Sequence, residues 1–136
     1  MSASFGYVTE PISLTVIKGQ TWVQEMQWLA GESGAEVAVN ISSIDMVCHI
    51  RRSVPSGDIL FTLTNANGGI VYDSPTEGKY SLVLTGEQTQ TLCARNTPED
   101  LRIDILLTED SGATYEPFLF GTIQALPWAT RPWEVV

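Results

Sequence analysis

The stretch IDMVCHIRR (Ile44–Arg52) separates apolar from polar side chains by simple alternation. One parity holds Ile44, Met46, Cys48 and Ile50, and the other holds Asp45, Val47, His49 and Arg51. Because successive side chains of a β-strand point to opposite faces of the sheet, this pattern indicates a strand with one buried face. It therefore predicts a half-buried strand over residues 44–52.

Similar segments recur along the chain, with turn signals about every ten residues. Two glycine-containing turns, Lys18-Gly19 and Asn65–Gly69, are expected to close antiparallel hairpins, and Pro117 is expected at a sheet edge or a bulge. Residues 86–94 lack the period of two and leave room for a short helix. The expected strands cover residues 12–17, 20–29, 44–52, 59–64, 70–73, 79–85, 101–108 and 115–124.

Seven to eight short strands and hardly any helical periodicity predict an all-β fold. We expect a single antiparallel β-sandwich of immunoglobulin-like type, with a small barrel as the competing architecture. The 136 residues fit one domain (1–136) with a short N-terminal arm (1–11) and a Pro/Trp-rich C-terminal arm (125–136). With no apolar run of about 18 residues and no signal-peptide pattern, neither a membrane span nor export is expected.

Composition and motifs argue against several kinds of chemistry. Sixteen acidic against seven basic residues give a formal net charge of −9, which disfavours binding to nucleic acid. The two cysteines, Cys48 and Cys93, fit no common zinc spacing and are expected to be buried, reduced thiols. His49 is the only histidine and is expected to be exposed on the opposite face from Cys48. We therefore expect no catalytic site, no cofactor, no metal and no enzymatic activity.

The four tryptophans fall into two groups. Trp22 and Trp28 have the inward parity of a strand and are expected in the core. Trp128 and Trp133 lie in LPWATRPW (Leu126–Trp133), after the last expected strand. Each proline there favours an extended backbone, so the two indoles must fold back on the domain or dock on another chain. The candidate partner-binding residues are Pro127, Trp128, Arg131, Pro132 and Trp133.

The order of these segments resembles that of small β-sandwich virion proteins of tailed bacteriophages. The segments that carry the resemblance span residues 12 to 131. They are KGQTW (18–22), WL (28–29), NISSI (40–44), ILFTLTNANGGIVY (59–72), GKYSLVLTGEQTQ (78–90), LRIDILLTED (101–110) and FLFGTIQALPWATR (118–131). Such domains are similar to the N-terminal module of baseplate upper proteins and to short prophage structural proteins. This chain has Gly19-Gln20-Thr21 where the family has a Gly-Asp-Thr turn, and a longer loop after Trp28.

The resemblance implies a non-enzymatic virion component, made in the host cytoplasm and present in multiple copies. Its expected partners are other virion proteins and itself, in the tail, baseplate or neck. Two alternatives stay open. A capsid decoration protein has the same sequence features. A carbohydrate-binding module for host-surface glycans would need exposed tryptophans, and the inward parity of Trp22 and Trp28 counts against it.

Overall fold

The computed structural model describes residues 12–31, 34–52, 58–93, 96–109, 112 and 114–127. Strands dominate this part of the chain, with a single short helix and a 3-10 turn. In chain order they are β1 (Ile12–Ile17), β2 (Trp22–Gln27), β3 (Leu29–Ala30), β4 (Val37–Ala38), β5 (Asp45–Arg52), β6 (Ile59–Thr64), β7 (Ile70–Ser74), η1 (Pro75–Glu77), β8 (Lys79–Leu84), α1 (Gly86–Thr89), β9 (Glu99–Thr108) and β10 (Glu116–Leu126).

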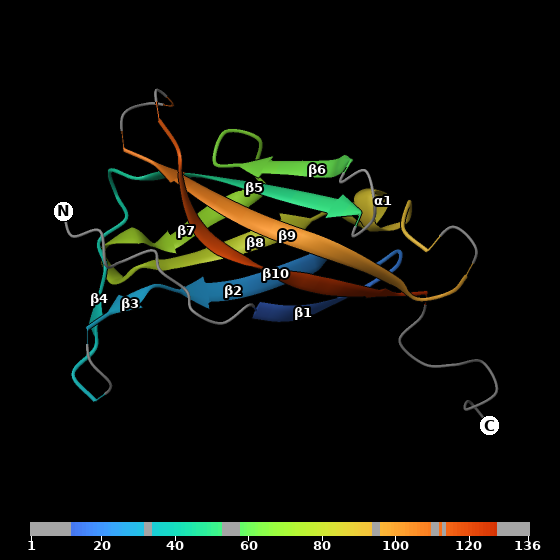
Figure 1. Cartoon of the computed structure of the whole chain (residues 1–136), viewed down its shortest axis with the longest axis horizontal. Helices are drawn as coiled ribbons and strands as arrows, with labels where there is room; N and C mark the ends of the chain where they lie inside the picture. Colours follow the sequence, from blue (N-terminus) through green and yellow to red (C-terminus); the bar gives the residue numbers. More distant parts are fainter. Residues whose placement is uncertain are drawn as a thin grey trace.

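The eight longer strands form the two layers of a β-sandwich (Figure 1). One sheet has the order β1-β10-β9-β5-β6, the other has the order β2-β8-β7, and β3 and β4 form a separate short ribbon. In immunoglobulin domains the strands C, F and G share one sheet, and B, E and D share the other. Here β5, β9 and β10 take the places of C, F and G, and β2, β8 and β7 those of B, E and D. The fold is an immunoglobulin-like β-sandwich, as the strand pattern predicts.

The side chains that the sequence pattern places on the inward side of the strands are the ones buried in the core. The strand β5 buries Met46, Cys48 and Ile50, each at most 1% exposed, and Ile44 just before it is 4% exposed. Trp22 and Trp28 are also buried, at 8% and 5% exposed, as expected. The rings of Trp28 and Phe118 lie 4.3 Å apart between centroids, which joins the end of β2 to β10 of the opposite sheet.

Both turns that were expected to close hairpins instead carry the chain from one sheet to the other. β1 and β2 lie in different sheets, and so do β6 and β7. β1 pairs in parallel with β10, from Ile12 opposite Gly121 to Ile17 opposite Leu126. The hairpin prediction was wrong because each strand has one apolar face, and alternation alone does not say whether two such faces lie side by side or pack across the core.

Smaller differences concern the ends of elements. β10 continues through Leu126, two residues beyond the predicted end at Gln124, because β1 pairs along it and Lys18 N donates to Leu126 O. The helix α1 covers four residues, although the sequence left room for nine. A capping box in which Thr85 and Gln88 bond each other's backbone fixes its start. Pro117 lies at the predicted bulge, where the register of β10 on β9 shifts.

Two glycines provide a matched test of the packing at one end of the sandwich. Gly78 has φ +70°, and a Cβ there would lie 2.6 Å from Trp28 O and 2.8 Å from Val39 O. Gly68 has φ +79°, with no heavy atom within 4 Å of such a Cβ. We expect Gly68→Ala to cost roughly 1 kcal/mol, the left-handed penalty alone. Gly78→Ala should cost roughly 3 kcal/mol, because two carbonyl groups must also move.

Urea unfolding of the two glycine variants measures this difference. Equal losses of stability in both variants would show that the segment around Gly78 is not held as tightly as its contacts indicate.

Two tyrosines of the inward rows make the free energy of unfolding depend on pH in the alkaline range. Burial raises the pKa of Tyr72 to about 12, and burial raises the pKa of Tyr80 well above its ordinary value. The neutral hydroxyls therefore contribute stability that is complete below pH 10. This stability is lost as the pH rises through the pKa values of the folded state. We expect the free energy of unfolding to fall between pH 10 and about 12, less steeply in Tyr72→Phe than in the wild type. Identical slopes would assign the pH dependence to other groups.

Candidate binding surfaces

The candidate residues of the C-terminal arm lie almost entirely outside the described residues. Pro127 is described and is half-buried after the end of β10. Trp128, Arg131, Pro132 and Trp133 fall outside the described ranges. Their expected role in partner binding stays a prediction.

Cys48 and His49 lie on opposite faces of β5, as the alternation predicts. The Cys48 side chain is completely buried, and burial together with the charge of Asp104 raises its pKa to about 12. His49 is half-buried rather than exposed, because it lies between Thr62 of β6 and Asp104 of β9, on an inner strand of the five-stranded sheet. Burial and the charge of Arg51 lower the pKa of His49, whereas Asp104 raises it.

Among the described residues, no group of three or more His, Cys, Asp or Glu side chains is placed to hold a metal ion. Likewise, no helix within the described ranges is long and apolar enough to cross a membrane.

The outer face of β2, β8 and β7, here called the three-stranded face, combines valines with acidic groups. Register places Val23 opposite Val83 and Glu25 opposite Ser81, and on the other side of β8 it places Val71 opposite Ser81. Val23 is 55% exposed and Val71 is 43% exposed. The outward residues of the three-stranded face are Val23, Glu25, Gln27, Val71, Asp73, Lys79, Ser81 and Val83.

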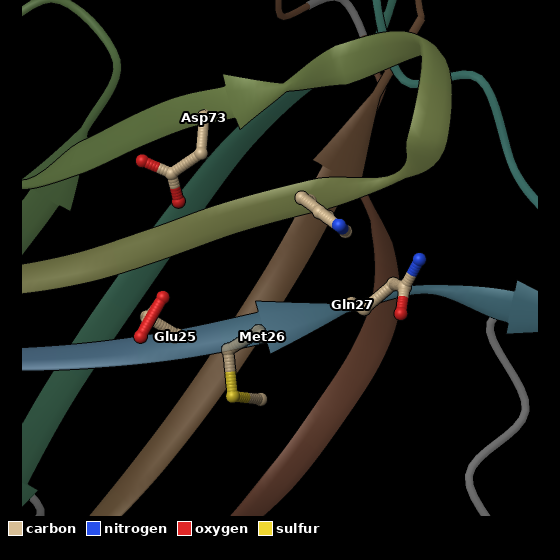
Figure 2. Close-up of a pocket in the computed structure, with 5 residues that line it drawn as sticks. Glu25, Met26, Gln27 and Asp73 are labelled. Carbon is tan, nitrogen blue, oxygen red and sulfur yellow. The ribbon is translucent and has the colours of Figure 1, made fainter.

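Ser81 lies at the centre of this face and is 4% exposed. Its Oγ donates a hydrogen bond of 2.5 Å to Asp73 Oδ2, so the serine positions the carboxylate above the sheet. A hollow of about 290 Å³ beside it is lined by Glu25, Met26, Gln27, Asp73 and Lys79. Figure 2 shows the Glu25 and Asp73 side chains on β2 and β7, with β8 between these strands. The carboxylates of Glu25 and Asp73 outnumber the Lys79 ammonium, which makes the hollow acidic.

The outer face of the sheet β1-β10-β9-β5-β6, here called the five-stranded face, carries positive charge at one place. Arg51 and Arg102 are directly opposite each other on β5 and β9. The Nε atom of Arg51 lies 3.6 Å from Asp104 Oδ2, and both side chains are about one third exposed. Phe120 is opposite Asp104 and is 46% exposed. The next row of outward residues across the strands, beside the row of Asp104 and Phe120, consists of Thr64, Val47, Leu106 and Pro117.

Sequence reasoning did not single out either face. Alternation places Val23, Glu25 and Phe120 on the outward parity, so part of the signal is present in the chain. Cross-strand register, which brings Arg51 to Arg102 and Glu25 to Ser81, is not readable from the separate strands. Both faces offer exposed apolar side chains beside charged ones, a combination suited to non-covalent contact with another protein surface.

The strand order defines the class as an immunoglobulin-like β-sandwich, and comparisons of whole structures add two similar domains. Tim-2 matches with a TM-score of 0.41 and 10% identity over 91% of this chain and 99% of its own. The ASH / PapD-like domain of human CEP192 matches with a TM-score of 0.34 and 12% identity over 96% of this chain and 99% of its own. Neither likeness bears on function at these scores. No family model and no curated protein sequence matches the chain.

The buried thiol gives a test of the core at the centre of the five-stranded sheet. In a Cys93→Ala variant, Cys48 should react with Ellman's reagent at pH 8 only as fast as the whole domain unfolds, because the thiol is both inaccessible and protonated. The same variant in urea should react completely within the mixing time of the experiment. Fast labelling of the native variant would contradict the packing around β5.

Proposed function

We propose that this chain is a non-enzymatic structural component of a tailed-phage virion. In this role it is made in the host cytoplasm, is present in multiple copies and mediates protein–protein assembly in the tail, baseplate or neck. Two lines of reasoning support the proposal: the resemblance of the strand and turn segments over residues 12–131, and the nature of the exposed surface.

The observation that carries an assembly role is the exposure of apolar side chains on the outer faces of both sheets. Val23 and Val71 project from the three-stranded face, and Phe120 projects from the five-stranded face. Exposed apolar groups rimmed by polar ones are characteristic of protein contact surfaces. Half-exposed valine and phenylalanine side chains gain more from burial against another apolar surface than from contact with water.

The alternative of a carbohydrate-binding module receives less support. Sugar-binding sandwiches need aromatic platforms on the surface, and Trp22 and Trp28 are buried in the core. Trp128 and Trp133 lie outside the described residues. Of the described aromatic residues, Tyr115 and Phe120 are the strongly exposed ones. Tyr115 precedes β10, whereas Phe120 lies within it beyond the bulge.

The decisive experiment locates the protein in particles. Purified virions from the producing strain should contain it in many copies by quantitative mass spectrometry, and immunogold labelling should place it on the tail, baseplate or neck. Labelling of the capsid surface would favour a decoration protein instead. Absence from purified particles, or binding to host glycans by the isolated protein, would overturn the proposal.

The C-terminal arm offers a second test that separates folding from assembly. β10 ends at Leu126, so a chain ending at Pro127 keeps every described strand. We expect this truncation to leave the far-UV circular dichroism nearly unchanged and to reduce incorporation into particles, because tryptophans on an extended backbone are frequent interface anchors. Trp128→Ala/Trp133→Ala in the full chain should reproduce the effect. A truncated chain that unfolds would show that these indoles complete the core of the domain itself.

A further inference from the structure

Each outer face of the sandwich offers a surface that another protein can pack against. A chain with a net charge of −9 repels copies of itself over most of its surface. Of the five basic residues in the described ranges, three lie together at one end of β5 and β9: Arg51, Arg52 and Arg102. Arg52 pairs with Glu99 at the strand end, which leaves Arg51 and Arg102 as the cations of the five-stranded face.

The side-by-side position of Arg51 and Arg102 costs the isolated domain some stability, since like charges directly opposite each other in a sheet are destabilising. Asp104 contacts Arg51, and Asp100 lies two residues from Arg102 on the same parity. With Asp45 on the same parity of β5, the three acidic groups outnumber the two cations of this face, but the two arginines are directly opposite each other on β5 and β9. An acidic surface placed over them would replace the repulsion by attraction.

The three-stranded face of the same chain is such a surface. Glu25 and Asp73 project from it, and Glu77 is held at its margin by contacts from Gln27 and Ser74. Its apolar part, Val23, Val71 and Val83, has a counterpart in Phe120, Leu106 and Val47 of the five-stranded face.

We propose that copies of this chain stack head to tail, with the three-stranded face of one copy packed on the five-stranded face of the next. A two-fold contact between three-stranded faces would bring two surfaces of the same negative charge together, and one between five-stranded faces would not bring that acidic surface to the arginine pair. Stacking unlike faces avoids both of these arrangements. It leaves a three-stranded face exposed at one end of the stack and a five-stranded face exposed at the other. Such a contact is heterologous, so it generates a ring or a filament. The inference rests on the proposed assembly role and names its partner as a second copy.

The size of the contact sets the expected strength. Three strands at the usual spacing are about 14 Å wide, and six residues are about 20 Å long. This area is below that of standard stable interfaces, so the association of isolated copies is weak and its strength in an assembly comes from repetition. It is measured at high protein concentration, by sedimentation equilibrium up to roughly 1 mM.

Charge-swapped variants test the orientation of the contact. Glu25→Lys alters only the three-stranded face, and Arg102→Glu alters only the five-stranded face; both side chains are exposed. In a head-to-tail stack each variant alone meets like charge, so each should self-associate at least about fivefold more weakly than the wild type. An equimolar mixture should regain most of the wild-type association, because every contact in it again joins opposite charges. Glu36→Lys, the same charge change away from both faces, should behave like the wild type.

The outcomes separate this inference from the proposed function. A wild-type chain that stays monomeric at 1 mM, or variants that mixing does not rescue, would overturn the stacking. Normal association by Glu25→Lys alone would show that the three-stranded face is not used. Detection of the protein in virions is independent of these results, so the assembly role can hold when the stacking fails. Circular dichroism of each variant checks that the fold is retained.

Discussion

The structure depends on apolar packing between the inward rows of the two sheets, whose buried residues form one core cluster. Tyr80, Leu82 and Leu84 of β8 are at most 1% exposed, as are Leu101, Ile103 and Ile105 of β9. In antibody domains a disulfide joins the B and F strands of the two sheets. Here β2 and β9 have those places and contain no cysteine, and Cys48 and Cys93 are free thiols. Side-chain burial therefore holds the two layers together without a covalent link.

Hydrogen bonds reinforce the sandwich where the chain changes layers. The hydroxyl of Tyr72 on β7 donates to Ile44 O beside β5 of the other sheet. Trp28 N donates to Gly78 O, and Val39 N donates to Trp28 O, so the end of β2 holds two loops at once. At the opposite end, Thr89 Oγ1 donates to Gln20 O and ties α1 to the crossing between β1 and β2. Each bond satisfies a polar group next to the core, where an unpaired one would be costly.

The alternation of apolar residues was enough to predict the strands and the side of each that is buried. It could not assign strands to sheets: the pattern of Ile12–Ile17 is the same whether β1 pairs with β2 or with β10. The ribbon of β3 and β4 escaped prediction because two-residue strands have no period to read. The predicted partner-binding residues lie beyond β10 and outside the described ranges, apart from Pro127. The two outer faces emerge only with register, which depends on contacts between distant segments.

Each of the three shifts of register among the described strand pairs falls at the edge of a sheet. They fall in β6 near Leu60, in β7 near Asp73 and in β10 near Phe118. β6 and β7 are edge strands, and this part of β10 extends beyond the residues that pair with β1. An irregular edge is a poor template for another strand, because its free amide and carbonyl groups no longer follow an even spacing. Along β6, β7 and the start of β10 the domain is thereby hindered from adding a strand of another copy, whereas the edge strands β1 and β2 pair without a shift of register.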